Sequence, residues 1–251
     1  MKIESAACSF SGRRNHNEDS FCDEPGLGLF AVADGVGGYE GGEVASAIVV
    51  AELAAFFTRY VDDPASTWPF RTEPNRSLPE NALAVAVQQA HRGIEARREG
   101  KLASMASTVA ALSVGSGAAV IAHCGDSRVY RLRADVLTQL TRDHSLYQQL
   151  LASGAADLPP PNEYPFKNVV TRVLGTEQHE AEVRTEPLCD GDVFLLCSDG
   201  LVEGAPDPLI AELLASERPR GSCSRLVREA YDRGSRDNIT ALVVSVQSSA
   251  S

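Results

Sequence analysis

The sequence predicts one domain that combines strands and helices and carries two long loops. Segments typical of strands are spread along the whole chain, and segments with helical periodicity form two separate pairs. The proline-rich stretch 62–79 joins two expected helices, and strands continue on both sides of it. A chain of 251 residues is long enough to bury a sizeable core. We therefore expect a single domain over residues 1–247 and a short polar tail over 248–251.

The first half of the chain begins with strands and continues with a pair of helices. Lys2–Ser9 alternates weakly, and Leu29–Ala33 is a continuous apolar run, a pattern typical of a strand covered on both faces. Apolar residues recur at helical spacing over Glu43–Tyr60 and again over Asn81–Glu99. The prolines at 64, 69, 74 and 79 predict that Asp62–Pro79 is a loop.

The second half contains most of the strands and a second pair of helices. Strands are expected at Ser107–Val114, Ala118–Cys124, Ser127–Arg133, Leu137–Leu140, Glu182–Pro187, Asp192–Cys197 and Ile239–Val246. Helical spacing is found in Ser145–Ala152, Pro208–Ser216 and Ser222–Gly234. Four prolines make Gly154–Pro165 a second long loop, and long loops in compact domains are often functional.

Charge and composition exclude several classes of function. The net charge of −11 argues against binding to nucleic acid or to anionic membranes, because both depend on Lys and Arg. The apolar stretch Ala45–Phe57 is short and contains Glu52, so we expect a buried helix and no membrane span. The chain starts without an apolar leader, and its six cysteines form no CxxC pair. These features predict a cytoplasmic protein with reduced, buried cysteines and no disulfide.

Carboxylates stand at the ends of several apolar strands that lie far apart in the sequence. Three such strands run directly into an acid, another strand is preceded by one, and an acidic pair closes the polar loop 11–19; the residues are Asp34, Asp126, Asp199, Asp237 and Glu18-Asp19. A carboxylate at the edge of a core is costly unless it is paired or bound to a cation. If these groups converge, their oxygen ligands would select Mg²⁺ or Mn²⁺.

Each of these residues also has a simpler interpretation when it is taken alone. A single Asp-Gly is most often a turn, and Gly35 and Gly200 permit both a tight turn and close backbone approach. Glu18-Asp19 could be a solvated loop, and Arg14 a surface charge. The repetition of one pattern, an apolar strand followed by an acid, favours a shared site.

Other catalytic motifs are incomplete. Residues 37–43 have the glycine spacing of a phosphate-binding loop, but Glu43 replaces the required Lys. A cysteine phosphatase using Cys124 is a weak alternative, because Arg131 stands one residue too far from that cysteine. The chain has no GxSxG elbow and no HExxH pair, so we expect each histidine to lie at the surface or in the core.

Six motifs, in order and spanning nearly the whole chain, resemble the metal-dependent PPM family, the type 2C Ser/Thr protein phosphatases, in its compact bacterial form. The motifs lie at residues 14–20, 33–38, 124–128, 141–145, 197–201 and 234–240, and read RNHNEDS, ADGVGG, CGDSR, TRDHS, CSDGL and GSRDNIT. The resemblance implies an α+β fold, a four-layer α/β/β/α sandwich in which two packed antiparallel sheets are flanked by helix pairs. It also implies that the metals lie at one end of the sandwich.

The resemblance further implies a role for each residue of the site. Asp34 would bridge two Mn²⁺ or Mg²⁺ ions, one held also by Glu18 and the Gly35 carbonyl, the other by Asp199 and Asp237. Asp126 would hold a third, weaker ion, Asp19 would orient the attacking water, and Arg14 would bind the phosphate. A hydroxide bridging the two metals would then hydrolyse phosphoserine and phosphothreonine in proteins and oppose a Ser/Thr kinase. We expect a monomer whose partners are a cognate kinase and its phosphorylated substrates.

Some positions depart from the family pattern. Val36 replaces a histidine proposed as general acid in animal members, so protonation of the leaving group is expected to fall to water. Glu203 replaces an Asp that contributes to the third metal in many members. The segment 154–168 resembles a mobile flap, which Pro159–Pro161 would stiffen, and 62–79 looks like an insertion. The alternative function is a catalytically weak regulator of the same fold that binds phosphoproteins.

Overall fold

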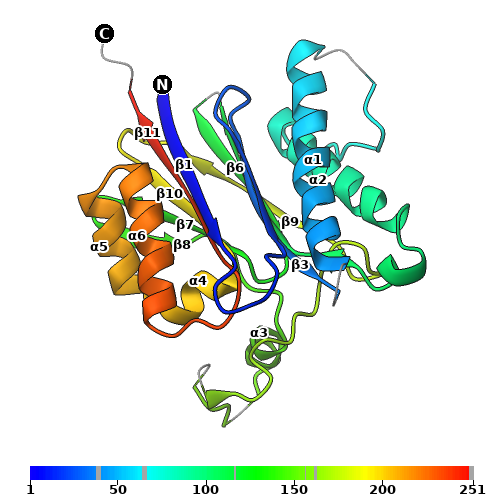
Figure 1. Ribbon diagram of the computed structural model, residues 1–251. Helices are drawn as coiled ribbons and strands as arrows, with labels where there is room; N and C mark the ends of the chain where they lie inside the picture. The colour runs from blue at the N-terminus through cyan, green and yellow to red at the C-terminus, as the bar shows by residue number, and fades with distance from the viewer. Residues whose placement is uncertain (38–40, 64–66, 116, 156, 161–162, 249–251) are drawn as a thin grey trace.

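The computed structural model shows two antiparallel sheets packed face to face with helices on both outer faces (Figure 1). It describes residues 1–37, 41–63, 67–115, 117–155, 157–160 and 163–248. The predicted four-layer α+β sandwich is therefore confirmed. The described part of the expected polar tail is Ser248, and residues 249–251 lie outside the described residues.

The first sheet brings both ends of the chain together. Its order is β1-β11-β10-β7-β8, with antiparallel neighbours throughout. The strands are β1 (Lys2–Phe10), β11 (Ile239–Gln247), β10 (Val193–Cys197), β7 (Arg128–Arg133) and β8 (Val136–Gln139). Its outer face is covered by α5 (Asp207–Ser216) and α6 (Pro219–Asp232) (Figure 1).

The second sheet contains the segment that we predicted to be a doubly covered strand. Its order is β2-β3-β5-β6-β9, and β4 pairs with the end of β3. The strands are β2 (Asp19–Glu24), β3 (Leu29–Val36), β4 (Ala106–Ser107), β5 (Val109–Gly115), β6 (Ala118–Cys124) and β9 (Glu182–Pro187). The long helices α1 (Gly41–Asp62) and α2 (Leu78–Glu95) cover its outer face.

Burial on both faces explains the continuous apolar runs of β3 and β11. In β3, Phe30 and Val32 point into the core between the sheets, whereas Ala31 packs under α1 and α2. In β11, Leu242 packs between the sheets and Val243 under α5 and α6. Because side chains alternate along a strand, a strand with a core on each side favours apolar residues at consecutive positions.

One described helix, α1, is long and apolar enough to cross a membrane over Gly41–Val61. Ala45, Val49 and Leu53 of this helix are fully buried in the layer beneath the second sheet. The apolar character of α1 is thus used in the protein core, as predicted for the stretch around Glu52.

Several element boundaries differ from the prediction. The structure adds β2, in the polar-to-apolar segment after residue 18, and the short helix α4 (Asp199–Gly204). The expected loop 62–79 is shorter, because α1 extends through Asp62 and α2 begins at Leu78 with Ser77 as N-cap. The helix expected to reach Glu99 ends at Glu95, and the expected strand Ser107–Val114 is split into β4 and β5.

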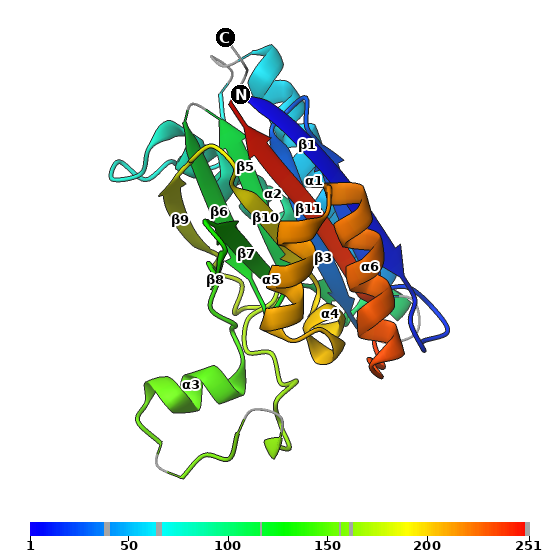
Figure 2. The ribbon, with the colours of Figure 1, turned by 90° about the vertical axis from the view of Figure 1, so that its left-hand side faces the viewer.

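Helix α3 (Leu146–Ala152) and the loop after it project away from the sandwich (Figure 2). Ser145 caps α3 by accepting a hydrogen bond from the Gln148 amide, as is typical of an N-cap serine. The Tyr147 hydroxyl donates to the Pro159 carbonyl at 3.0 Å, which attaches the loop to the helix. Of the proline run expected to stiffen this segment, Pro161 lies outside the described residues.

Candidate active site

The predicted acidic residues converge at one end of the sandwich. A pocket of about 740 Å³ is lined by the end of β3, by the start of α4 and by loops at the ends of strands, including Arg14, Glu18, Asp34, Gly35, Asp126, Asp199 and Asp237. Asp19 is buried and is not among the residues that line this pocket. Residues up to 223 positions apart in the sequence therefore share one site.

The pairing of β2 with β3 positions the first group of ligands. Asp19 and Asp34 are partners in the antiparallel register, and the Gly35 amide donates to the Glu18 carbonyl at 3.1 Å. A Cβ atom added at Gly42 would lie 2.7 Å from the Glu18 carboxylate and 2.8 Å from the Gly35 carbonyl oxygen. These two predicted ligands are thus neighbours beneath the start of α1.

The glycines that follow Asp34 and Asp199 allow close packing and do not form turns. Gly35 is inside β3 and Gly200 is in the first turn of α4, so the turn interpretation is wrong at both positions. An added Cβ would approach the Gly42 carbonyl oxygen to 2.0 Å at Gly35, and the Asn238 carbonyl oxygen to 2.0 Å at Gly200. Only glycine therefore fits at either position.

Asp19 is held by two hydroxyl groups that the sequence analysis did not single out. Ser198 and Thr240 each donate to its Oδ2 at 2.7 Å, whereas Oδ1 is buried and has no hydrogen-bond partner in the structure. A buried, unpartnered carboxylate oxygen is costly unless a ligand uses it. A polar Thr240 within the apolar strand β11 is the signal that could have revealed this contact.

Asn238 fixes the loop that carries Arg14 and Glu18. Its side-chain amide donates to the carbonyls of Ser11 and His16, and its Oδ1 accepts from the Glu18 amide at 2.8 Å. The loop between β1 and β2 is therefore tied to the start of β11. This residue was quoted within a motif but was given no role.

Asp126 is oriented by a histidine of the 141–145 motif. It follows Gly125, whose φ of 111° lies in the left-handed region, and the Gly125 amide donates to Nδ1 of buried His144 at 3.1 Å. The same motif is tied to β7, because Asp143 accepts two hydrogen bonds from Arg128 at 2.7 and 2.9 Å. These contacts give the motif a structural role that the sequence analysis had not assigned.

Ionising these buried carboxylates is costly, and a bound cation would lower that cost. Burial, followed by repulsion from neighbouring carboxylates, raises the pKa of Asp34 well above its ordinary value. Burial likewise raises the pKa of Asp126 to about 8, of Asp19 to about 7 and of Asp199 to about 6. The Oδ1 atom of Asp199, like that of Asp19, is buried without a partner. An all-oxygen set with unpartnered atoms fits hard divalent cations.

Arg14 supplies the positive charge at the rim of the site. Its guanidinium donates to the Asp237 carboxylate at 2.7 Å, and its side chain is 58% exposed. The hydrogen bond and the charge of Asp237 raise the pKa of Arg14, so the arginine stays charged. A mostly exposed guanidinium beside the acids is free to turn toward an anionic substrate.

The two departures from the family pattern also have structural explanations. Val36 is 45% exposed at the end of β3 and offers no proton to the pocket that it lines. The Glu203 carboxylate accepts from the Arg236 amide at 2.9 Å, and this residue is not among the described residues that line the pocket. Asn168, Val170 and Val173, which follow the projecting loop, complete the wall.

A second group of potential metal ligands lies outside this pocket. Atoms of His123, His144 and Glu182 are within 4.8 Å of one another. However, Nδ1 of His144 accepts from the Gly125 amide, so its proton is on Nε2, which faces Glu182 at 3.2 Å. A histidine that binds a metal through Nε2 normally donates from Nδ1, so the tautomer disfavours a metal here. The expectation that these histidines are core residues stands.

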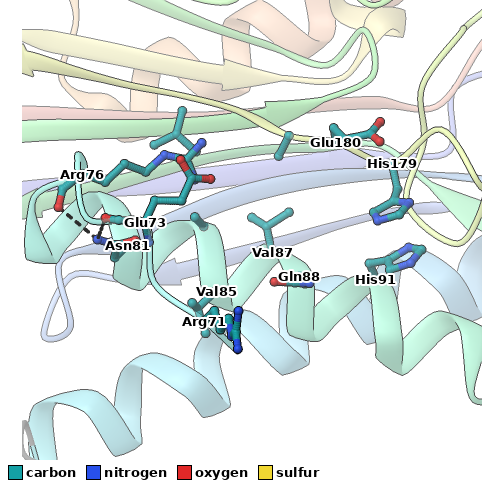
Figure 3. A pocket seen from close by; sticks show the side chains of 13 residues that line it. Arg71, Glu73, Arg76, Asn81, Val85, Val87, Gln88, His91, His179 and Glu180 are labelled. Atoms are coloured by element: carbon teal, nitrogen blue, oxygen red, sulfur yellow. Dashed lines mark hydrogen bonds and ion pairs between the residues drawn. The ribbon is translucent and has the colours of Figure 1, made fainter. Parts of the chain in front are cut away.

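A separate hollow of about 300 Å³ lies between α2 and the segment that enters β9 (Figure 3). His91 and His179 stack there with ring centres 3.6 Å apart, and none of the predicted site residues lines it. Cys124 is fully buried, so its thiol cannot reach a phosphate ester on another protein, and burial raises its pKa to about 12; both observations argue against the cysteine-phosphatase alternative.

A sandwich of two antiparallel sheets with converging carboxylates and an arginine at one end is the arrangement expected of a metal-dependent phosphatase. The family model described as Protein phosphatase 2C matches residues 11–234, and the chain belongs to this family. The predicted activity, hydrolysis of phosphoserine and phosphothreonine in proteins, is confirmed by this membership and by relatives that cover most of the chain.

Relatives and solved structures agree over nearly the full length. The chain is 34% identical to the serine/threonine phosphatase stp of Listeria innocua, over 92% of this chain and 90% of that protein. It superposes on the Mycobacterium tuberculosis serine/threonine phosphatase PstP/Ppp with a TM-score of 0.85 and 33% identity, covering 98% and 99% of the two chains. A structure of the PstP catalytic domain in complex with two manganese ions superposes with a TM-score of 0.82 and 34% identity, covering 98% and 99% of the two chains.

Proposed function

We propose that this chain dephosphorylates Ser and Thr side chains of proteins at a two-metal centre formed by Glu18, Asp34, Gly35, Asp199 and Asp237. The observation that carries the proposal is the convergence of these five groups from separate segments into one pocket. Their carboxylates repel one another, and the Oδ1 atom of Asp199 is buried without a partner, so the arrangement suits bound cations. The manganese ions bound to PstP support Mn²⁺ or Mg²⁺ as the metal.

Each residue around the metal centre is assigned a separate role. When bound, the metals activate water for in-line attack on phosphorus and neutralise developing charge. Arg14 turns from Asp237 to the phosphate oxygens and binds them with two parallel hydrogen bonds. Asp19 is buried behind the pocket and fixed by Ser198 and Thr240; its Oδ1, which has no protein partner, is the acceptor that we assign to orienting the attacking water. Because Val36 has no proton to give, the leaving oxygen takes its proton from solvent.

Asp126 is proposed as the ligand of a third, weaker ion. This residue lines the same pocket, and burial, followed by repulsion from Asp199, raises the pKa of Asp126. Glu203, which stands where the family resemblance implies an Asp in many members, accepts a hydrogen bond from the Arg236 amide. We therefore expect the third site to have fewer protein ligands than the bridged pair and to fill only at higher metal concentration.

The domain extent, cellular location, oligomeric state and partner of the protein are proposed from the same activity. We propose that residues 1–247 act as one phosphatase domain, in a cytoplasmic monomer that opposes a cognate Ser/Thr kinase. The net charge of −11 supports partners other than nucleic acid and anionic membranes. Sedimentation velocity tests the monomer, which a concentration-dependent dimer would contradict.

Hydrolysis of a phosphothreonine peptide by the pure protein tests the activity. We expect phosphate release that requires Mn²⁺ and stops with EDTA. Arg14→Ala should raise KM by roughly tenfold or more, because a charge-assisted pair to phosphate is lost. Arg13→Ala is the matched control, since Arg13 lies 5.3 Å from the centre of the Tyr231 ring. No turnover with or without Mn²⁺, in a protein with normal circular dichroism, would favour the phosphoprotein-binding regulator.

A further inference from the structure

Two cysteines that the phosphatase chemistry does not use lie in direct contact. The Sγ atoms of Cys8 and Cys223 are 3.0 Å apart, although the residues are 215 positions apart in the sequence. This separation is only about 1 Å longer than a covalent disulfide bond of about 2.05 Å. Among the six cysteines, all of which the structure describes, no other pair shows a contact between sulfur atoms.

The surroundings hold both side chains in place. Cys8 lies on β1, at the edge of the first sheet, and Cys223 lies on α6, which packs against that strand (Figure 1). Phe10 and Tyr231 pack edge to face at 5.3 Å across the same junction. The strand and the helix are therefore already docked, so bringing the two sulfur atoms into bonding distance requires little backbone movement.

The two thiols differ in access. Cys8 is half-buried, and its sulfur lies 3.4 Å from the hydroxyl of Ser224, an exposed residue of α6. Cys223 has no exposed surface, and burial together with the Cys8 thiol raises its pKa to about 12. A small oxidant therefore meets Cys8 first, and Cys223 is the only thiol within reach to complete the reaction.

We propose that Cys8 and Cys223 form a disulfide when the protein meets a hydroperoxide, and that this bond fastens β1 to α6. The Cys8 sulfur takes one oxygen of hydrogen peroxide and becomes a sulfenic acid, with release of water. The Cys223 sulfur then bonds to the Cys8 sulfur, and the hydroxyl of the sulfenic acid leaves with the Cys223 proton as a second water. Two thiols are oxidised by two electrons, and one peroxide is reduced to two waters.

The bond would stabilise the part of the fold that precedes the active-site loop. β1 is an edge strand with one neighbour, and it continues into the loop of Arg14 and Glu18. A cross-link between residues so distant in sequence restricts the unfolded chain and removes conformational entropy from it. The oxidised protein should therefore melt at a higher temperature than the reduced protein.

The test is peptide mapping of the Mg²⁺-loaded protein after mild treatment with hydrogen peroxide and alkylation of the remaining thiols. We expect a cross-linked peptide pair containing Cys8 and Cys223, which dithiothreitol separates, and a rise in melting temperature of several degrees. Cys223→Ala and Cys8→Ser should lack both the cross-link and the rise. Cys189→Ser, which removes an exposed thiol, should retain both.

A different product would overturn the inference. If Cys8 and Cys223 are recovered as separate alkylated peptides at a peroxide dose that oxidises Cys189, the pair does not form a bond. A cross-link without any change in melting temperature would contradict the claim that it fastens β1 to α6. Neither readout depends on phosphatase activity, so this test is independent of the proposed catalytic roles.

Discussion

Asp19 and Asp34 stand opposite each other across the antiparallel pairing of β2 with β3. One register therefore places both the candidate bridging ligand and the residue expected to orient water. Asp34 lines the pocket, whereas Asp19 is held from behind by hydroxyl groups of β11 and of the residue before α4. A shift of one residue in this pairing would turn one of the two carboxylates to the other face of the sheet.

Replacing the central carboxylate should separate stability from metal binding. Asp34→Asn removes an acid whose ionisation is penalised by burial and by repulsion from neighbouring acids, so the metal-free protein should melt at a higher temperature than the metal-free wild type. The same change should reduce Mn²⁺-dependent turnover by about 100-fold or more, because a ligand to both ions is lost. Differential scanning fluorimetry and phosphate release measure the two effects.

A surface carboxylate provides the control for that experiment. Asp232, at the end of α6, pairs with Arg228 at 3.5 Å, and both side chains are largely exposed. Asp232→Asn should change neither the melting temperature nor turnover appreciably, since exposed ion pairs contribute little. An Asp34→Asn protein with full activity would contradict the proposed metal site.

The stability of the metal-free protein should depend on pH with a defined sign. The folded-state pKa values of about 6 for Asp199, 7 for Asp19 and 8 for Asp126 lie above the ordinary value of 3.8. The folded protein therefore binds more protons than the unfolded chain across this range, so its stability falls as pH rises from about 4 to about 8. Thermal melts in EDTA at several pH values should show this decline.

Bound Mn²⁺ should reverse that trend, because the metal binds the deprotonated carboxylates. The rise in melting temperature on adding saturating Mn²⁺ should therefore be larger at pH 8 than at pH 6. A metal-free melting temperature that stays constant or increases over this range would show that the acids do not share one site.

The ends of the apolar strands could be predicted from the sequence, and the contacts between distant segments could not. Asp34, Asp199 and Asp237 were identified because an acidic residue beside a long apolar run is unusual, however the strand is paired. The strand β2 was missed because only Phe21 and Cys22 interrupt a polar segment whose strand character depends on pairing with β3. Likewise, α4 was missed because an Asp-Gly pair more often makes a turn than starts a helix.

Residues that act through another residue left the weakest signal. Asn238, Ser198 and His144 are polar side chains whose importance comes from hydrogen bonds to residues that lie far away in the sequence. Neither periodicity nor composition reports such a partner. Their presence inside motifs that resemble a known family was the only indication, and it gave no role.

The contact between His144 and Gly125 should control the third metal site. His144→Leu leaves the buried Gly125 amide without an acceptor, which costs about 1–3 kcal/mol and releases Asp126 from its position. His144→Asn is the matched variant, because its side-chain oxygen can accept from the same amide. Calorimetric titration with Mn²⁺ should show reduced affinity at the third metal site in the leucine variant and nearly normal affinity in the asparagine variant. Equal Mn²⁺ affinity at the third site in both variants would show that the His144–Gly125 hydrogen bond does not control that site.

The hydroxyl of Thr240 should matter for catalysis more than for binding. Thr240→Val keeps the shape of the side chain but removes one of the two donors to Asp19, so the carboxylate loses a charge-assisted hydrogen bond of about 1.5–3 kcal/mol. The pKa of Asp19 should rise further, and kcat should fall by roughly tenfold or more, while KM for a phosphothreonine peptide changes little. Thr240→Ser retains the donor and should recover most of kcat. If the serine and valine variants lose kcat equally, packing in β11, and not the hydrogen bond to Asp19, is what the threonine provides.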